Sequence, residues 1–245
     1  MNLLEVQGLR KTYPAFRLED VSFSVPEGAV MGLIGRNGAG KSTTLKSILG
    51  LVHPDAGRVE MFGREFSENE RYIKENIGVV LGGIDFYPKK KVRTITDVTR
   101  RFYSNWQEEK YRHYLDLFAI DENKRVDQLS SGMRVKYLLA LALSHNARLL
   151  ILDDPTSGLD PVSRDELTEL LRRIAADGTR SVLFSTHITS DLEKCASHIT
   201  FIQEGRLQRS DTLAGFMAHY ADLGSTLEEI IVAAERRPYD ADAII

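Results

Sequence analysis

The stretch "GLIGRNGAGKSTT" constrains the fold of this chain more than any other, because a glycine-rich loop there joins an apolar strand to a helix. Its spacing, Gly35-x-x-x-x-Gly40-Lys41-Ser42, is typical of a phosphate-binding loop when a strand precedes it and a helix follows it. Glycine lets backbone N–H groups approach phosphate oxygens, and the helix start adds the positive end of its dipole. A chance glycine-rich turn is the alternative. The residues expected to bind a nucleotide here are Gly35, Asn37, Gly38, Ala39, Gly40, Lys41, Ser42 and Thr43.

The stretch "LLILDDPTSGLD", residues 149–160, places two adjacent acids at the end of a second apolar strand. Buried carboxylates are costly unless they bind a metal or take part in chemistry. A phosphate loop of this kind needs such a carboxylate to hold Mg²⁺ together with the hydroxyl of Ser42. Asp153 is therefore the expected magnesium ligand, and Asp154 is expected to orient water for attack on the terminal phosphate. Either acid could instead start a turn or cap the following helix, although Asp160 suits that cap better.

Composition narrows the class of protein. The chain has 245 residues, of which 42% are hydrophobic, and its formal net charge is −3. That supports a substantial core, and no apolar stretch is long enough to cross a bilayer. The charge gives no general basic field, so no nucleic-acid partner is expected. The one cysteine, Cys195, excludes an internal disulfide framework and is expected to be a packed small residue in a reducing compartment. The first residues lack the layout of a signal peptide.

Strand-like and helix-like segments alternate along most of the chain. This alternation predicts an α/β fold, a P-loop NTPase with a mostly parallel sheet core and helices on both faces. The alternating apolar residues of "LLEVQGL" and "FRLEDVSFSV" predict an N-terminal antiparallel β subdomain. Aromatic and charged residues with helical spacing predict an inserted α-helical subdomain at about 82–136. We expect one domain over residues 1–245, with a C-terminal helical extension at about 211–245.

Together these motifs resemble the nucleotide-binding subunits of ATP-binding cassette (ABC) transporters. The stretches "GRNGAGKST", "LSSGM", "LLILDDPTSGLD" and "STH" follow the order and spacing of that family, from about Leu3 to Leu207. The resemblance implies an Mg²⁺-dependent ATPase that binds ATP and hydrolyses it to ADP and phosphate. It also implies that two subunits close head-to-tail around two ATP molecules, so the chain is expected to form a homodimer.

The resemblance assigns further residues to the ATP site. Tyr13 matches an aromatic residue that stacks on adenine, with an ordinary surface tyrosine as the alternative. The signature loop of the family corresponds to Ser130, Ser131 and Gly132, and it reaches the terminal phosphate held by the opposite subunit. His187 matches the histidine that hydrogen-bonds that phosphate and helps to place the water, with a structural histidine at a strand end as the alternative.

Three departures from the family pattern carry expectations of their own. Asp154 replaces the usual glutamate, and its side chain is one methylene shorter. Because a misplacement of about 1 Å can lower a rate ~10²-fold, hydrolysis is expected to be slow. Ser131 and Met133 replace glycine and glutamine in the signature. Gly82 stands where the family has a glutamine that contacts Mg²⁺, and Asp85 could replace that oxygen ligand.

ATPases of this family drive a membrane permease. We expect that integral-membrane permease subunit on a separate chain, with this protein cytoplasmic and held at the inner face of the cell membrane through it. The stretch "YPKKKVRTITDVTRRFYSNW", residues 87–106, could meet the permease or anionic headgroups, or be an ordinary solvated face. A single cassette with a short C-terminal helix resembles exporters of drug, peptide or lipid-like substrates more than sugar importers. The alternatives are a soluble ABC ATPase acting in translation or DNA repair, and an ATP-dependent dimerisation switch not coupled to transport.

Overall fold

The computed structural model describes residues 1–81 and 87–236. Its strands are β1 (Asn2–Tyr13), β2 (Phe16–Pro26), β3 (Val30–Ile34), β4 (Ala56–Met61), β5 (Arg64–Glu65), β6 (Ile77–Leu81), β7 (Leu149–Asp153), β8 (Ser181–Thr186), β9 (His198–Gln203) and β10 (Arg206–Thr212). Its α-helices are α1 (Lys41–Ile48), α2 (Phe66–Asn76), α3 (Val92–Thr99), α4 (Glu108–Leu117), α5 (Ser131–Ser144), α6 (Pro161–Ala175), α7 (Thr189–Cys195), α8 (Leu213–His219) and α9 (Leu227–Glu235), and its 3-10 turns are η1 (Arg100–Phe102) and η2 (Val126–Gln128). Across these described ranges, none of the helices combines the length and apolar character needed to span a membrane.

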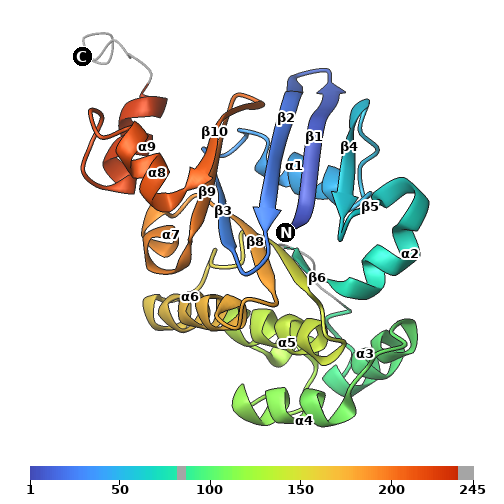
Figure 1. The fold of residues 1–245 in the computed structure, drawn as a ribbon. Coiled ribbons are helices and arrows are strands. Elements are labelled where there is room, and N and C mark those ends of the chain that lie inside the picture. The colour runs from blue at the N-terminus through green and yellow to red at the C-terminus, as the bar shows by residue number, and fades with distance from the viewer. Residues whose placement is uncertain (82–86, 237–245) are drawn as a thin grey trace.

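Within the described residues, ten strands form one sheet in the order β5-β4-β1-β2-β10-β9-β3-β8-β7-β6. The run from β9 to β6 pairs in parallel, and it contains the strands that lead into the predicted phosphate loop and the paired acids. Strand β1 pairs antiparallel with both β2 and β4, and these strands lie on the opposite side of the molecule from α3 and α4 (Figure 1). The predicted combination of a mostly parallel core with antiparallel N-terminal strands is confirmed.

Both faces of the central sheet are apolar, because successive residues of a strand point to opposite faces and helices cover each of them. On one face Leu33 of β3 belongs to the same buried cluster as Leu45 and Ile48 of α1. On the other face Ile34 belongs to a cluster with buried residues of α5, α6 and α7. Cys195 lies in this second cluster, and burial raises the pKa of its thiol to about 12, so the expectation of a packed residue is confirmed.

Helices α3 and α4 form a third buried cluster with α5, at the end of the molecule away from β1 and β2 (Figure 1). Its polar centre is the hydroxyl of Thr96, which is 2.7 Å from the hydroxyl of Tyr111 and 2.9 Å from that of Tyr137. Buried hydroxyls that satisfy one another avoid the cost of desolvation. A separate core agrees with the expected helical insertion, whose bounds stay a prediction.

The structure adds two features that the sequence does not specify. The helix after the phosphate loop ends at Ile48, and Gly50 follows with a left-handed φ of 69°. Strand β10 is not predicted from the sequence, whereas α8 lies within the expected C-terminal helical extension at about 211–245. Strand β10 is mostly polar and forms because Glu204 and Gly205, with φ of 49° and 78°, turn the chain back onto β9.

Candidate active site

The phosphate loop lies between β3 and α1, at the carboxyl end of the parallel strands. Gly40 has a φ of 113°, and a Cβ there would lie 2.9 Å from Cζ of Phe16. At Gly35 a Cβ would lie 2.1 Å from the carbonyl oxygen of Ile202. Both places therefore require glycine. No described side chain caps the start of α1, so its first N–H groups are left for an anion.

A cavity of about 530 Å³ opens beside this loop. It is bounded by the β1–β2 hairpin, the loop, the start of α1 and the ends of β7 and β8. Its lining residues are Tyr13, Ala15, Phe16, Asn37, Gly38, Gly40, Lys41, Ser42, Thr43, Asp153, Asp154 and Ser185. The structure thus brings together most of the residues that the sequence predicts for one site. Gly35 and Ala39 are buried and do not belong to this lining.

Lys41 is buried at the inner end of the cavity. Its Nζ donates hydrogen bonds to the carbonyl oxygens of Gly35 at 2.6 Å and Arg36 at 3.0 Å. Burial lowers the pKa of Lys41, and nearby carboxylates, Asp154 foremost, oppose that change. An ammonium group held in this way suits phosphate oxygens.

Asp153 ends β7 with its carboxylate fixed by two hydroxyls. Its Oδ1 accepts hydrogen bonds from Oγ of Ser42 at 3.0 Å and Oγ of Ser185 at 2.6 Å. Ser185 is the position on β8 that pairs with Asp153, which explains the short contact. Hydroxyl and carboxylate oxygens are the ligands that Mg²⁺ prefers, so the pair Ser42 and Asp153 fits the predicted ion.

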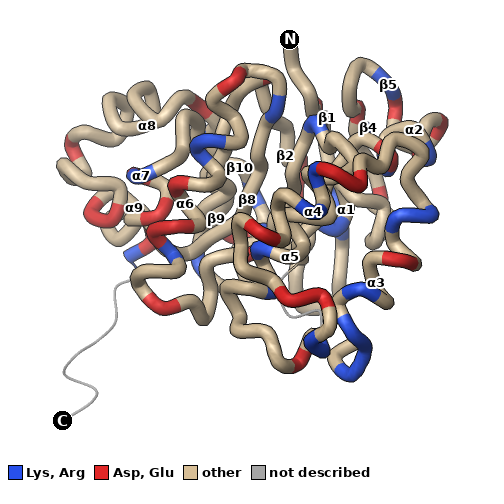
Figure 2. The backbone as a smooth tube through the Cα atoms, turned by 90° about the horizontal axis from the view of Figure 1, so that it is seen from below, with Lys and Arg blue, Asp and Glu red and all other residues tan. Residues whose placement is uncertain are grey.

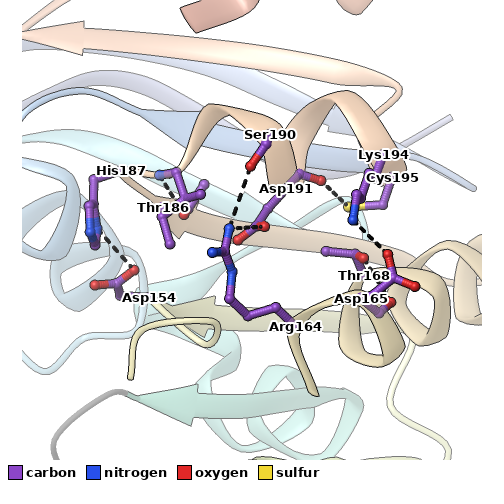
Figure 3. Close-up of polar contacts among 11 residues, drawn as sticks. Asp154, Arg164, Asp165, Thr168, Thr186, His187, Ser190, Asp191, Lys194 and Cys195 are labelled. Atoms are coloured by element: carbon purple, nitrogen blue, oxygen red, sulfur yellow. Dashed lines mark hydrogen bonds and ion pairs between the residues drawn. The ribbon is translucent and has the colours of Figure 1, made fainter. Parts of the chain in front are cut away.

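Asp154 turns away from β7 with a left-handed φ of 49°, a conformation in which aspartate and asparagine are enriched. Its N–H donates to Oγ of Ser185 at 2.9 Å and to the carbonyl oxygen of the same residue at 3.2 Å. Its Oδ1 is buried and lies 3.4 Å from Nδ1 of His187, close enough for an ion pair but outside hydrogen-bond geometry (Figure 3). The structure therefore brings both residues predicted to be catalytic face to face.

Tyr13 and Phe16 lie on the hairpin side of the cavity. They are paired positions at the turn between β1 and β2, and the Tyr13 residue is 38% exposed. Nζ of Lys11 lies 5.7 Å from the centroid of the Tyr13 ring. Phe16 and Ser185 are lining residues that the sequence analysis does not single out. The short turn "YPAF" indicates Phe16, because paired residues across a hairpin share one face of the sheet.

The predicted signature residues lie apart from this cavity. The described residues of its lining include none of Ser130, Ser131 and Gly132, which form the start of α5. Oγ of Ser130 accepts the N–H of Met133 at 3.2 Å and so caps the helix. Oγ of Ser131 donates to the carbonyl oxygen of Gly158, at 3.2 Å, in the turn that precedes α6. The side chains of Ser130 and Ser131 are exposed at the helix start, whereas Gly132 is buried.

Asp160 caps α6, as the sequence predicts, by accepting the N–H groups of Val162 and Ser163. Asp153 and Asp154 are therefore not the caps of α6. Gly82 and Asp85, the positions of the expected magnesium-contacting loop, lie outside the described residues, so that expectation stays a prediction.

The glycine-rich loop, the parallel sheet and the carboxylate at the end of the neighbouring strand define the class of P-loop NTPases. The sequence profile of the family described as ABC transporter matches residues 18–157. The bacitracin transport ATP-binding protein BcrA of Bacillus licheniformis is 32% identical over 208 residues, which are 84% of this chain and 68% of that protein. The Nod factor export ATP-binding protein I of Burkholderia orbicola (strain AU 1054) is 38% identical over 191 residues, 76% of this chain and 62% of that protein.

Solved structures agree with these sequence relatives. One described as the ATP-binding subunit of an ABC transporter superposes with a TM-score of 0.85 and 28% identity, covering 96% of this chain and all of its own. The ATP-binding cassette MJ0796, described as a dimer in a post-hydrolysis state bound to ADP and Pi, has the same fold, with a TM-score of 0.75 and 21% identity over 86% of this chain and 98% of its own. The chain belongs to the family of ABC transporter ATP-binding subunits, and the predicted resemblance is confirmed.

Proposed function

We propose that the chain binds ATP with Mg²⁺ in the 530 Å³ cavity and hydrolyses it to ADP and phosphate. The observation that carries this proposal is one cavity lined by a buried lysine, a serine–aspartate pair and Asp154, which His187 faces at 3.4 Å. Lys41 and Ser42 come from the start of α1, Asp153 and Asp154 from the end of β7, and His187 from the end of β8, and the parallel sheet holds these ends together.

The binding roles follow from the positions of the side chains. Tyr13, with Phe16 beside it, offers an aromatic face to the adenine. The N–H groups of the loop and the amine of Lys41 hold the phosphates. Ser42 and Asp153 hold Mg²⁺, which neutralises charge on the phosphate oxygens when it is bound. Ser185 keeps the carboxylate of Asp153 pointing into the cavity through its 2.6 Å hydrogen bond.

Asp154 and His187 serve the attack on the terminal phosphate. The carboxylate of Asp154 accepts a hydrogen bond from the attacking water and so aims its oxygen at the phosphorus. His187 stands beside that carboxylate, 3.4 Å from it, and its side chain is 41% exposed. The shorter side chain of Asp154 makes the hydrolysis slow, since its oxygens lie farther back than those of a glutamate.

The complete site is a property of a homodimer in this proposal. Ser130, Ser131 and Gly132 lie away from the cavity of their own chain, and the exposed Ser130 and Ser131 can approach the terminal phosphate of a second copy. Support comes from the dimer reported for the cassette with the same fold. The exposed turn around Gly158 would then lie at the seam, because Ser131 contacts it.

The work that the ATPase performs is export through a separate membrane permease. Support comes from the export functions named for the bacitracin and Nod factor relatives. A cavity of about 570 Å³ between α2 and η1, lined in part by Arg101, Phe102 and Tyr103, offers the permease a groove, and the Phe102 residue is 73% exposed. Figure 2 shows Lys and Arg residues gathered beside α3, and Lys89, Lys90 and Lys91 directly precede this helix in the sequence. Charge reversal at these lysines that left membrane recruitment intact would contradict this part of the proposal.

The experiment that tests hydrolysis is phosphate release by the purified chain with Mg-ATP. We expect Lys41→Met to lower the rate ~10²-fold or more, because a buried charge aimed at the phosphates is lost. Lys46→Met is the matched control: Lys46 is on the same helix but exposed, and its loss is expected to leave the rate unchanged. Equal rates in both variants would overturn the proposed function.

A further inference from the structure

Helices α6 and α7 begin directly after two loops of the site. Helix α6 starts at Pro161, after the turn that contacts the signature loop, and α7 starts at Thr189, two residues after His187. Their first turns lie against each other, and Figure 3 shows the side chains that join them. A contact that holds these two helix starts in place therefore also holds the loop that carries His187.

A buried ion pair joins the two helix starts. Nη2 of Arg164 on α6 donates to Oδ1 of Asp191 on α7 at 2.6 Å, and it lies 3.5 Å from Oγ of Ser190 (Figure 3). The side chain of Asp191 is 3% exposed and that of Arg164 is 26% exposed. The charge of Asp191 is therefore held inside the protein almost entirely by one arginine.

Two hydrogen bonds of backbone N–H groups connect this pair to the histidine. The N–H of Asp191 donates to the carbonyl oxygen of Ile188 at 3.3 Å, and the N–H of Ile188 donates to Oγ1 of Thr186 at 3.0 Å. Thr186 ends β8 and Ile188 is the cap residue of α7, so these bonds enclose the single residue between them, His187. A shift of Asp191 moves the start of α7 and with it the direction in which the imidazole points.

The ion pair is a costly way to hold two helices together. Buried charges pay a large desolvation penalty, and removing one partner leaves an uncompensated charge. Within the described residues, Nε of Arg164 and Oδ2 of Asp191 are also buried without a hydrogen-bond partner. The same helices carry a second pair, Asp165 and Lys194, at the same 2.6 Å separation, with side chains 67% and 53% exposed. Exposed pairs contribute little to stability, so the two pairs make a matched comparison.

We propose that Arg164 is a positioning residue for His187: through Asp191 it sets the start of α7 and holds the imidazole against Asp154. The inference rests on the proposed ATP hydrolysis. Arg164, four positions after the Asp160 cap, thus acts on the chemistry although it contacts neither the nucleotide nor the attacking water.

The test compares Arg164→Gln and Asp191→Asn with the control Asp165→Asn. Asp191→Asn keeps a hydrogen-bond acceptor for Arg164, so it guards against a variant that fails to fold. We expect both buried-pair variants to lower kcat ~10-fold or more with little change in KM for ATP, since a misplaced catalytic group costs rate rather than binding. Arg164→Lys is expected to recover part of kcat, and Asp165→Asn is expected to match the parent.

A readout without activity separates this inference from the proposed function. The C2–H resonance of His187, assigned by its disappearance in His187→Gln, is expected to shift or broaden in Arg164→Gln and Asp191→Asn and to stay in place in Asp165→Asn. An unmoved resonance with unchanged kcat would overturn the positioning role. A parent chain that does not hydrolyse ATP would overturn the proposed function, while the resonance would still decide whether Arg164 orients His187.

Discussion

The aspartate that faces His187 combines two opposing properties. Its φ of 49° is a conformation that aspartate tolerates better than most residues, whereas its short side chain keeps the carboxylate close to the backbone. The 3.4 Å separation from Nδ1 of His187 shows that this reach is still enough to meet the histidine. Replacing Asp154 therefore tests charge and reach separately.

Loss of the charge is tested by Asp154→Asn. We expect phosphate release to fall ~10²-fold or more, because an amide is a far weaker acceptor for the proton of the attacking water. Nucleotide binding is expected to persist, since Lys41 and the loop are unchanged. Single-turnover phosphate release checks the expected loss of rate, and equilibrium nucleotide binding checks that binding persists. Equal rates in the variant and the parent would remove Asp154 from the mechanism.

Extra reach is tested by Asp154→Glu. The glutamate gains a methylene toward the water but meets the left-handed backbone with a less tolerant side chain, at a cost on the order of 1 kcal/mol. We expect a turnover at least equal to that of the parent. A large loss in the same phosphate-release assay would mean that the rest of the site, Ser185 included, is adapted to aspartate.

A second residue-scale prediction concerns acid stability. His145 is buried and its ring stacks on Tyr103 with centroids 3.7 Å apart. Burial lowers the pKa of His145 from 6.5 to about 4 in the fold. Between these values the unfolded chain binds the proton and the folded chain does not, so the free energy of unfolding falls as the pH falls from about 6.5 to about 4. The full loss is on the order of 3 kcal/mol.

Urea unfolding of the parent and of His145→Phe at pH 7 and pH 4.5 checks this predicted pH dependence. Phenylalanine keeps the aromatic face for Tyr103 but does not titrate. We expect the loss of stability between the two pH values to be smaller in the variant by 1–3 kcal/mol, on the order of the shift itself. An identical pH dependence in both proteins would show that His145 does not control it.

At the scale of elements, apolar runs flanked by turns are predicted well from the sequence. Strands β3, β7 and β8 lie in the core and their apolar residues leave few alternatives. Strand β10 lacks such a pattern, because its sequence "RLQRSDT" has one apolar residue and its pairing depends on the two-residue turn at Glu204 and Gly205. Helix α8 is short and contains Gly215, so helical periodicity is weak there.

The last described helix has a contact that the sequence pattern does not reveal. Glu235 at the end of α9 is buried, and its Oε1 accepts the N–H of Arg36 in the phosphate loop at 3.0 Å. Oε2 lies 3.6 Å from Nε of the same arginine. Glu235 and Arg36 are 199 positions apart in the sequence, and their contact braces the outer side of the phosphate loop. Sequence spacing carries no signal for such a contact.

Glu235→Ala tests this brace. A hydrogen bond to a charged group contributes about 1.5–3 kcal/mol, so its loss is expected to raise amide hydrogen exchange at Arg36 and along α9 by ~10-fold or more. Glu228→Ala is the control, because Glu228 is an exposed residue of the same helix. Unchanged exchange in Glu235→Ala, or an equal rise in the control, would argue against the brace.

At the scale of the whole molecule, the sequence predicts which residues carry the chemistry better than it predicts how they are held. Lys41, Ser42 and Asp153 follow from local motifs, because a strand end and a helix start fix their directions. Ser185 is not predicted, since its role depends on the pairing of β7 with β8. The signature residues illustrate a further limit: they lie at the start of α5, but the phosphate they serve lies in the other protomer in our proposal.

The proposed dimer leads to the last prediction: two inactive variants should complement each other when they are mixed. Lys41→Met damages the phosphate loop, and Ser130→Asp puts a carboxylate where the partner's phosphate would lie. Aspartate is a good N-cap residue, so α5 keeps the cap that Ser130 provides to the N–H of Met133. Each variant alone is expected to be nearly inactive in phosphate release, because every composite site then contains one defect.

In a mixture, a heterodimer holds one site with both defects and one site with none. Random mixing of two protomers in a symmetric dimer would restore about a quarter of the sites, so activity is expected to rise well above the sum of the two variants. The rise should require prior dilution and reassociation of the protomers. A mixture that stays at the sum would contradict composite sites, and a Ser130→Asp variant with full activity on its own would contradict the role of the signature loop.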